Sequence, residues 1–113
     1  MERDPAYLLD MLQAARDALA LSDGLTWEGF QASKLHQYAL VKILEIIGEA
    51  ARSISDETKA AHAAIPWAAI IGMRNHLVHR YFRIDLPVVW DVLKNHLGLL
   101  IAQLEPIVPP DKP

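Results

Sequence analysis

The chain has 113 residues, of which 52% are apolar and none is cysteine, and its formal net charge at pH 7 is −3. This length suits one domain that buries its own core. The lack of cysteine excludes a disulfide scaffold, a cysteine nucleophile and thiolate metal sites. The acidic balance argues against indiscriminate nucleic-acid binding.

The N-terminal residues have mixed charges and are followed by no apolar signal region. Apolar runs elsewhere fall short of the roughly 18 to 20 residues that a membrane span needs. We therefore expect a cytoplasmic protein without a membrane partner.

Helical periodicity begins near the N-terminus. The pattern predicts a first helix that has Asp4 as its N-cap and proline in its first turn, and that ends near Leu21. A short connector over residues 26–30 follows, and we expect Trp27 and Phe30 to attach it to the core.

A long helix is predicted over residues 33–53, with Ser33 as its cap. Its apolar stripe is wider than that of a simple surface helix, so we expect this helix to be both central and part of an interface. Gly48 permits close approach of another helix, either between subunits or within the bundle. The residues expected along one side are Leu35, Tyr38, Val41, Leu44, Ile47 and Ala51.

The C-terminal half is predicted to contain a short helix from Ser55 to about His62, a helix that begins at Pro66, and a last helix capped by Asp85. Residues 1–105 then form an all-α, antiparallel bundle of four to five helices, and residues 106–113 form a proline-rich tail. No stretch alternates with period two, so we expect no sheet. The expected inner face of the last helix comprises Val89, Trp90, Leu93, Leu97, Leu100 and Leu104.

Residues 73–83 concentrate three arginines, two histidines and a tyrosine, whereas all 14 acidic residues lie elsewhere. A local cationic site on an acidic body suits a confined anionic ligand such as a phosphate group.

Arg74 and His79 are five residues apart, which separates them by about 140° around a regular helix. They share a face only if the helix loosens here. A two-fold pairing of subunits would also help, because it presents the same patch twice in one groove.

The chemistry of such a groove follows from its groups. Imidazole transfers protons near neutral pH, and arginine binds phosphate oxygens while staying charged. RNA supplies its own nucleophile, the ribose 2′-hydroxyl, so its cleavage needs no metal. Two copies of one histidine could provide the base and the acid.

Simpler interpretations stay open on spacing alone. The histidines could be solvated, and Tyr81 and Phe82 could be core residues. The arginines could complement a helix dipole or pair with an acid, for which the candidates are Glu45, Glu49 and Asp85. A metal site would join His76 and His79 to further histidines. We do not expect one, because the segment has no carboxylate and its arginines repel a cation. The further histidines are His36, His62 and His96.

The order Arg74, four residues, His79, one residue, Tyr81 resembles the signature of HEPN-domain proteins of the HepT type. Residues 44–51, 65–75 and 78–90 also resemble the segments that surround this signature in the family. The resemblance covers roughly residues 3–105.

This resemblance implies a HEPN bundle that forms a homodimer. It also implies the toxin component of a type VII toxin–antitoxin system, acting as a metal-independent endoribonuclease without a cofactor. Arg74 and His79 would be catalytic. Tyr81 would accept AMP from an MntA-type nucleotidyltransferase antitoxin, and the added charge and bulk would silence the toxin.

We expect Asn75, His76, Arg80 and Arg83 to bind phosphate or RNA. Arg80 occupies the free position of the signature, where it could tighten RNA binding or grip the antitoxin. Two alternatives remain at this stage. One is a non-catalytic HEPN module that binds nucleotide or serves as the scaffold of a nucleotidyltransferase. The other is a structural helical dimer whose basic segment is a salt-bridged helix end.

Overall fold

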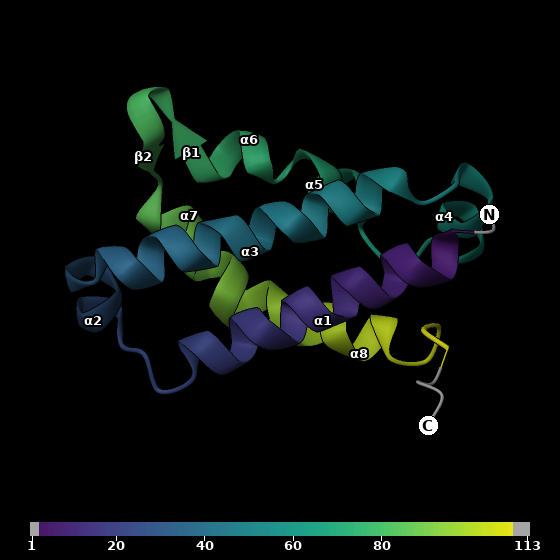
Figure 1. The fold of residues 1–113 in the computed structure, drawn as a ribbon, viewed down its shortest axis with the longest axis horizontal. Coiled ribbons are helices and arrows are strands. Elements are labelled where there is room, and N and C mark those ends of the chain that lie inside the picture. Colours follow the sequence, from purple (N-terminus) through teal and green to yellow (C-terminus); the bar gives the residue numbers. More distant parts are fainter. Residues whose placement is uncertain (1–2, 110–113) are drawn as a thin grey trace.

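The structure, a computed structural model, describes residues 3–109 (Figure 1). Four helical segments lie side by side, and consecutive segments run in opposite directions. The first two are α1 (Asp4–Ser22) and α3 (Lys34–Ser53). The third combines α5 (Trp67–Gly72) with α6 (Arg74–Leu77), and the fourth combines α7 (Leu86–Asp91), a π-helical turn (Val92–His96) and α8 (Leu97–Leu104). Short helices α2 (Trp27–Ala32) and α4 (Asp56–Ala61) lie in the connections. The predicted all-α bundle is confirmed.

Side-chain caps begin three of the helices where the sequence predicts them. The Ser33 hydroxyl accepts a hydrogen bond from His36 N at 3.2 Å, and the Ser55 hydroxyl accepts one from the first turn of α4. Asp85 Oδ1 accepts from Val88 N at 3.2 Å and caps α7. Each cap satisfies a backbone N–H that has no partner within its helix.

The prediction that Asp4 caps α1 is wrong, because Arg3 occupies the N-cap position and Asp4 is the first helical residue. The Asp4 carboxylate instead accepts hydrogen bonds from the Ser55 and Thr58 hydroxyls, both at 2.6 Å, and from Ser55 N at 3.0 Å. These bonds favour the ionised form and lower the pKa of Asp4 to about 2. Asp4 therefore ties the start of α1 to the start of α4.

The core lies between α3 and the helices around it, α1 on one side and α5 on the other. Leu35 and Tyr38, expected on the same side of α3 as buried residues, are 77% and 48% exposed. Gln37 is buried instead, because its amide donates to the carbonyl oxygens of Phe30 and Gln31 at the end of α2. The inner-face residues of the last helix are buried as predicted, apart from the half-buried Trp90.

An aromatic cluster attaches α2 to the rest of the bundle. The Phe30 ring is fully buried and stacks on Trp90 of α7 with ring centroids 5.5 Å apart. Trp27 contacts the same tryptophan at 5.7 Å. The expected attachment of this connector by Trp27 and Phe30 is thus confirmed.

Gly48 of α3 faces the backbone of α5. A Cβ atom at this position would lie 3.2 Å from the carbonyl oxygen of Ile70. The absence of a side chain therefore serves packing within the bundle, which was one of the two roles that the sequence left open.

The expectation of no sheet is wrong at one place. β1 (Val78–His79) and β2 (Arg83–Ile84) form an antiparallel hairpin that projects from one end of the bundle (Figure 1). Strands of two residues are too short to show the alternation that identifies a strand in a sequence.

The segment after α8 folds back onto the bundle. Val108 is buried and Ile107 packs against the core, so part of the predicted tail contributes to packing. The rest of that tail, residues 110–113, lies outside the described residues, as do residues 1–2. Within residues 3–109, no helix combines the length and the apolar character that crossing a membrane requires.

Candidate active site

The helical path breaks at the site segment, between Arg74 and His79. A loosened helix was the condition under which the sequence would let these two residues share a face. α6 spans a single turn, and Val78 adopts an extended conformation with φ −135° and ψ 133°. The fully buried Leu77 anchors the break, and its carbonyl oxygen accepts a hydrogen bond from Asp85 N at 2.8 Å. Arg74 therefore lies on a helix and His79 on a strand.

The hairpin places His79 and Arg83 opposite each other, because their Cα atoms are partners in the antiparallel register. Directly opposed residues point to the same face of such a pair. Arg83 is thus the arginine on the same face of the hairpin as His79, although Arg74 is the one in the sequence signature.

Tyr81 and Phe82 form the tip of the hairpin in an uncommon backbone conformation. Both have positive φ, 57° and 55°, which costs bulky residues on the order of 1–2 kcal/mol each. Tyr81 is 93% exposed, and Phe82 is held by a ring contact with Tyr38 of α3 at 5.4 Å. The alternative that both are core residues is therefore wrong, and the tight tip presents the Tyr81 hydroxyl to solvent.

Two carboxylates hold the two signature residues. Arg74 Nη1 donates to Glu49 Oε1 on α3, which is one of the pairings left open by the sequence. His79 Nε2 lies 3.1 Å from Asp85 Oδ2. The hydrogen bond from His79, followed by that from Val88 N, lowers the pKa of Asp85. Arg74 and His79 are thus directed to different carboxylates, one on α3 and one at the N-cap of α7.

The other predicted contact residues are open to solvent. Asn75, His76, Arg80 and Arg83 all have exposed side chains. In the part of the chain that the structure describes, neither Arg80 nor Arg83 has a salt bridge with an acid. Their charges are available to an external anion.

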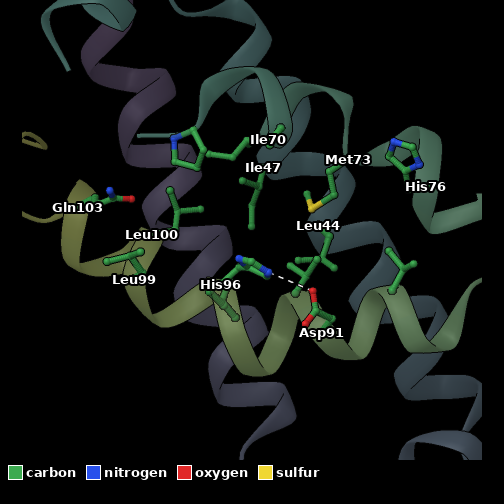
Figure 2. Close-up of a pocket in the computed structure, with 15 residues that line it drawn as sticks. Leu44, Ile47, Ile70, Met73, His76, Asp91, His96, Leu99, Leu100 and Gln103 are labelled. Carbon is green, nitrogen blue, oxygen red and sulfur yellow. Dashed lines mark hydrogen bonds and ion pairs between the residues drawn. The ribbon is translucent and has the colours of Figure 1, made fainter. Parts of the chain in front are cut away.

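A groove of about 390 Å³ adjoins this segment on the side of His76 (Figure 2). Its walls are mainly apolar and come from α3, α5 and the π-helical turn with α8. The π-helical turn brings His96 Nε2 within 3.0 Å of Asp91 Oδ2, five residues earlier. Sequence spacing did not predict this pair or the groove, because a regular helix would turn the two side chains apart.

No group of three metal-binding side chains is present within residues 3–109. Among these residues, the His79 imidazole hydrogen-bonds only to the Asp85 carboxylate. The available chemistry is proton transfer by His79 and binding of anions by the arginines.

An all-α bundle with an arginine on a short helix, a histidine on the following strand and an exposed tyrosine two residues later defines a HEPN domain of the HepT type. The model of the Ribonuclease HepT-like family matches residues 11–107. The chain belongs to this family.

Three of its relatives are similar to the chain over most of their length. The chain is 34% identical over 99 residues to the Probable ribonuclease HepT of Thermococcus cleftensis, and the aligned region covers 88% of the chain and 90% of that protein. It is 33% identical over 100 residues to Putative RNase MJ1380 of Methanocaldococcus jannaschii, covering 88% and 92%. Putative RNase TTE0752 of Caldanaerobacter subterraneus is 30% identical over 112 residues, covering 99% and 100%. No solved structure matches the chain.

Proposed function

We propose that this protein is the ribonuclease toxin of a type VII toxin–antitoxin system. The observation that carries the proposal is the exposed hairpin, where His79 and Arg83 share a face and Arg80 and Tyr81 reach solvent. Family membership and the names of the relatives support ribonuclease as the class of activity. The open position of these side chains suits a macromolecular substrate.

The proposed reaction is metal-independent cleavage of RNA. His79 accepts the proton of a ribose 2′-hydroxyl, and the 2′-oxygen attacks the adjacent phosphorus. Arg74 and the hairpin arginines stabilise the negative charge that develops on the phosphate oxygens. Asn75 and His76 would contact the same strand from α6.

A second copy of this chain is the proposed occupant of the apolar groove. Met73 and His76, which flank Arg74 and Asn75, also line the groove, so a two-fold contact there brings two site segments together. Leu99 at the groove is 63% exposed in the single chain, as expected for a residue covered on dimerisation. The homodimer would supply one histidine as base and the other as acid.

The proposed switch is AMP transfer to Tyr81 by an MntA-like nucleotidyltransferase antitoxin. A phosphodiester at this exposed hydroxyl adds a negative charge two residues from His79. Arg80 and Arg83, which have no acidic partner among the described residues, can bind that charge. The modification would then occupy the position that an RNA phosphate requires.

The catalytic assignment is tested with His79→Ala and, as a matched control, His62→Ala at the end of α4. Growth arrest on expression and cleavage of cellular RNA are compared, and sedimentation measures the dimer. We expect wild type and His62→Ala to cut RNA, and His79→Ala to lose both activities while the dimer persists. Cleavage by His79→Ala would refute the assignment.

The acceptor assignment is tested by incubation with the cognate transferase and ATP, followed by mass spectrometry. Tyr81→Phe should lose the AMP adduct and remain toxic in the presence of the antitoxin. Tyr38→Phe, altered at a nearby exposed tyrosine, should still be modified. Modification and silencing of Tyr81→Phe would show that another residue is the acceptor.

A non-catalytic nucleotide-binding partner of a transferase is the second candidate. Arg74 and His79 already pair with carboxylates, which favours this candidate. An RNA substrate would have to accommodate or displace those carboxylates. This candidate predicts that the purified protein binds ATP or AMP but leaves RNA intact.

A further inference from the structure

The contact between His79 and Asp85 has so far no assigned role in the site. The hairpin reverses the chain, so Asp85 returns to the side of His79, six residues earlier. Asp85 N donates a hydrogen bond to Leu77 O at 2.8 Å. Each carboxylate oxygen then has its own partner. Oδ1 accepts from Val88 N at 3.2 Å, and Oδ2 lies 3.1 Å from His79 Nε2.

The protonation of the two partners fixes the direction of this hydrogen bond. The pKa of Asp85 is lowered by its contacts, so the side chain is a carboxylate that can only accept. His79 Nε2 must therefore carry the hydrogen. A neutral imidazole has one N–H, which leaves a free lone pair on Nδ1. No described residue hydrogen-bonds to Nδ1, and the histidine side chain is 60% exposed.

We infer that Asp85 is a positioning residue that holds His79 in the Nε2–H tautomer and thereby makes Nδ1 the atom that reacts with RNA. This inference rests on the proposed ribonuclease function. It assigns Asp85 two roles, one at the start of α7 and one toward the imidazole, carried by two different oxygens.

The reaction step then balances as follows. Nδ1 of one His79 takes the proton of the 2′-hydroxyl, the 2′-oxygen bonds to phosphorus, and the bond from phosphorus to the 5′-oxygen breaks. The imidazolium of the second copy gives its Nδ1 proton to the departing 5′-oxygen. The products are a 2′,3′-cyclic phosphate and a 5′-hydroxyl. In both copies Nε2–H keeps donating its hydrogen bond to the Asp85 carboxylate, which also stabilises the imidazolium that forms.

Asp85→Asn separates the two roles of the side chain. Asparagine is a good N-cap, so its single oxygen keeps the bond from Val88 N and its NH₂ group faces His79. That group donates, so it requires a lone pair on Nε2 and moves the imidazole hydrogen to Nδ1. Asp85→Ser also preserves a cap, but its shorter side chain no longer holds the histidine.

The tautomer is read directly from long-range proton–nitrogen NMR correlations at about pH 8.5, well above the ordinary histidine pKa. The His79→Ala spectrum identifies the signal. We expect Nε2–H in wild type, Nδ1–H in Asp85→Asn and no fixed preference in Asp85→Ser. Asp56→Asn, an exposed acid of α4 at the far end of the bundle, should leave the wild-type tautomer unchanged.

The kinetic readout is RNA cleavage by the full chain. Asp85→Asn holds the wrong tautomer, so its kcat should be lower than that of wild type by about 100-fold or more. Its KM should stay within about twofold of the wild-type value, because the contact affects proton transfer rather than RNA binding. The kcat of Asp85→Ser should fall less, by about tenfold, and the kcat of Asp56→Asn should equal that of wild type. Thermal unfolding shows whether both Asp85 variants keep the fold.

Two outcomes overturn the inference itself. One is an Nδ1–H tautomer in the wild-type protein, and the other is an Asp85→Asn variant that is fully active. A wild-type protein with the Nε2–H tautomer that never cuts RNA overturns the proposed function, and with it the role of Nδ1. The spectrum and the cleavage assay therefore distinguish the two failures.

Discussion

The close approach of α3 and α5 at Gly48 predicts opposite effects for the same substitution at two glycines. Replacing glycine by alanine inside a helix stabilises it by about 1 kcal/mol. At Gly98 of α8, an added Cβ meets no atom within 4 Å, so Gly98→Ala should gain this amount. At Gly48 the Cβ lies 3.2 Å from the Ile70 carbonyl, and α5 must shift to admit it.

Crowding of this kind costs about 1–3 kcal/mol, which offsets or exceeds the gain in helix propensity. Gly48→Ala should therefore be less stable than Gly98→Ala by at least about 1 kcal/mol. That difference corresponds to roughly 4 °C in Tm for a chain of this size.

The two variants are compared by thermal and urea unfolding at several protein concentrations. Because the contact is within the bundle, the difference between them should not depend on concentration. Equal stabilisation of both variants would refute the close packing of α3 on α5. A difference that changes with protein concentration would assign Gly48 to a subunit interface instead.

Two further predictions concern charges. The pKa of Asp4 is about 2 in the folded state, below the ordinary aspartate value, so the unfolded chain binds more protons at low pH. Its contribution to stability is complete above about pH 4 and is lost as pH falls toward 2. Urea unfolding across this range should show a larger loss in wild type than in Asp4→Asn, which keeps the contribution of other carboxylates such as Asp85. Identical pH dependence of the two proteins would contradict the prediction. Arg80 and Arg83 should bind RNA phosphates, so replacing both by alanine should lower the salt dependence of RNA binding by about two phosphate contacts. Fluorescence titrations measure this slope, and an unchanged slope excludes these contacts.

Local chemistry explains why most of the helices could be predicted. Ser33, Ser55 and Asp85 accept from backbone N–H groups three residues later, and such caps depend only on neighbouring sequence. Asp4 looks like the same signal but is not a cap, because its partners are 51 and 54 residues away. No local pattern identifies a contact of that range.

The same limit applies to the site. The sequence identified Arg74, His79 and Tyr81 as its centre. It named a loosened helix as one condition for Arg74 and His79 to share a face, and the helix does break between them. It did not identify Asp85 as the partner of His79, since that contact needs a hairpin too short to leave an alternating pattern. Nor did it predict the positive φ of Tyr81, which bulky residues adopt only when the surrounding fold holds them there.

The arrangement of the arginines explains how an acidic protein could still bind RNA. Arg74 is held by Glu49, so its position is set before any substrate arrives, although an exposed pair of this kind adds at most about 1 kcal/mol to stability. Arg80 and Arg83 lack such a pair among the described residues and project from a hairpin that has no acid of its own. Arg74 is thus the preorganised arginine, whereas Arg80 and Arg83 supply the charge that attracts an anion. The acids lie outside the hairpin, so in the proposed function they would confine RNA binding to the hairpin without cancelling its charge.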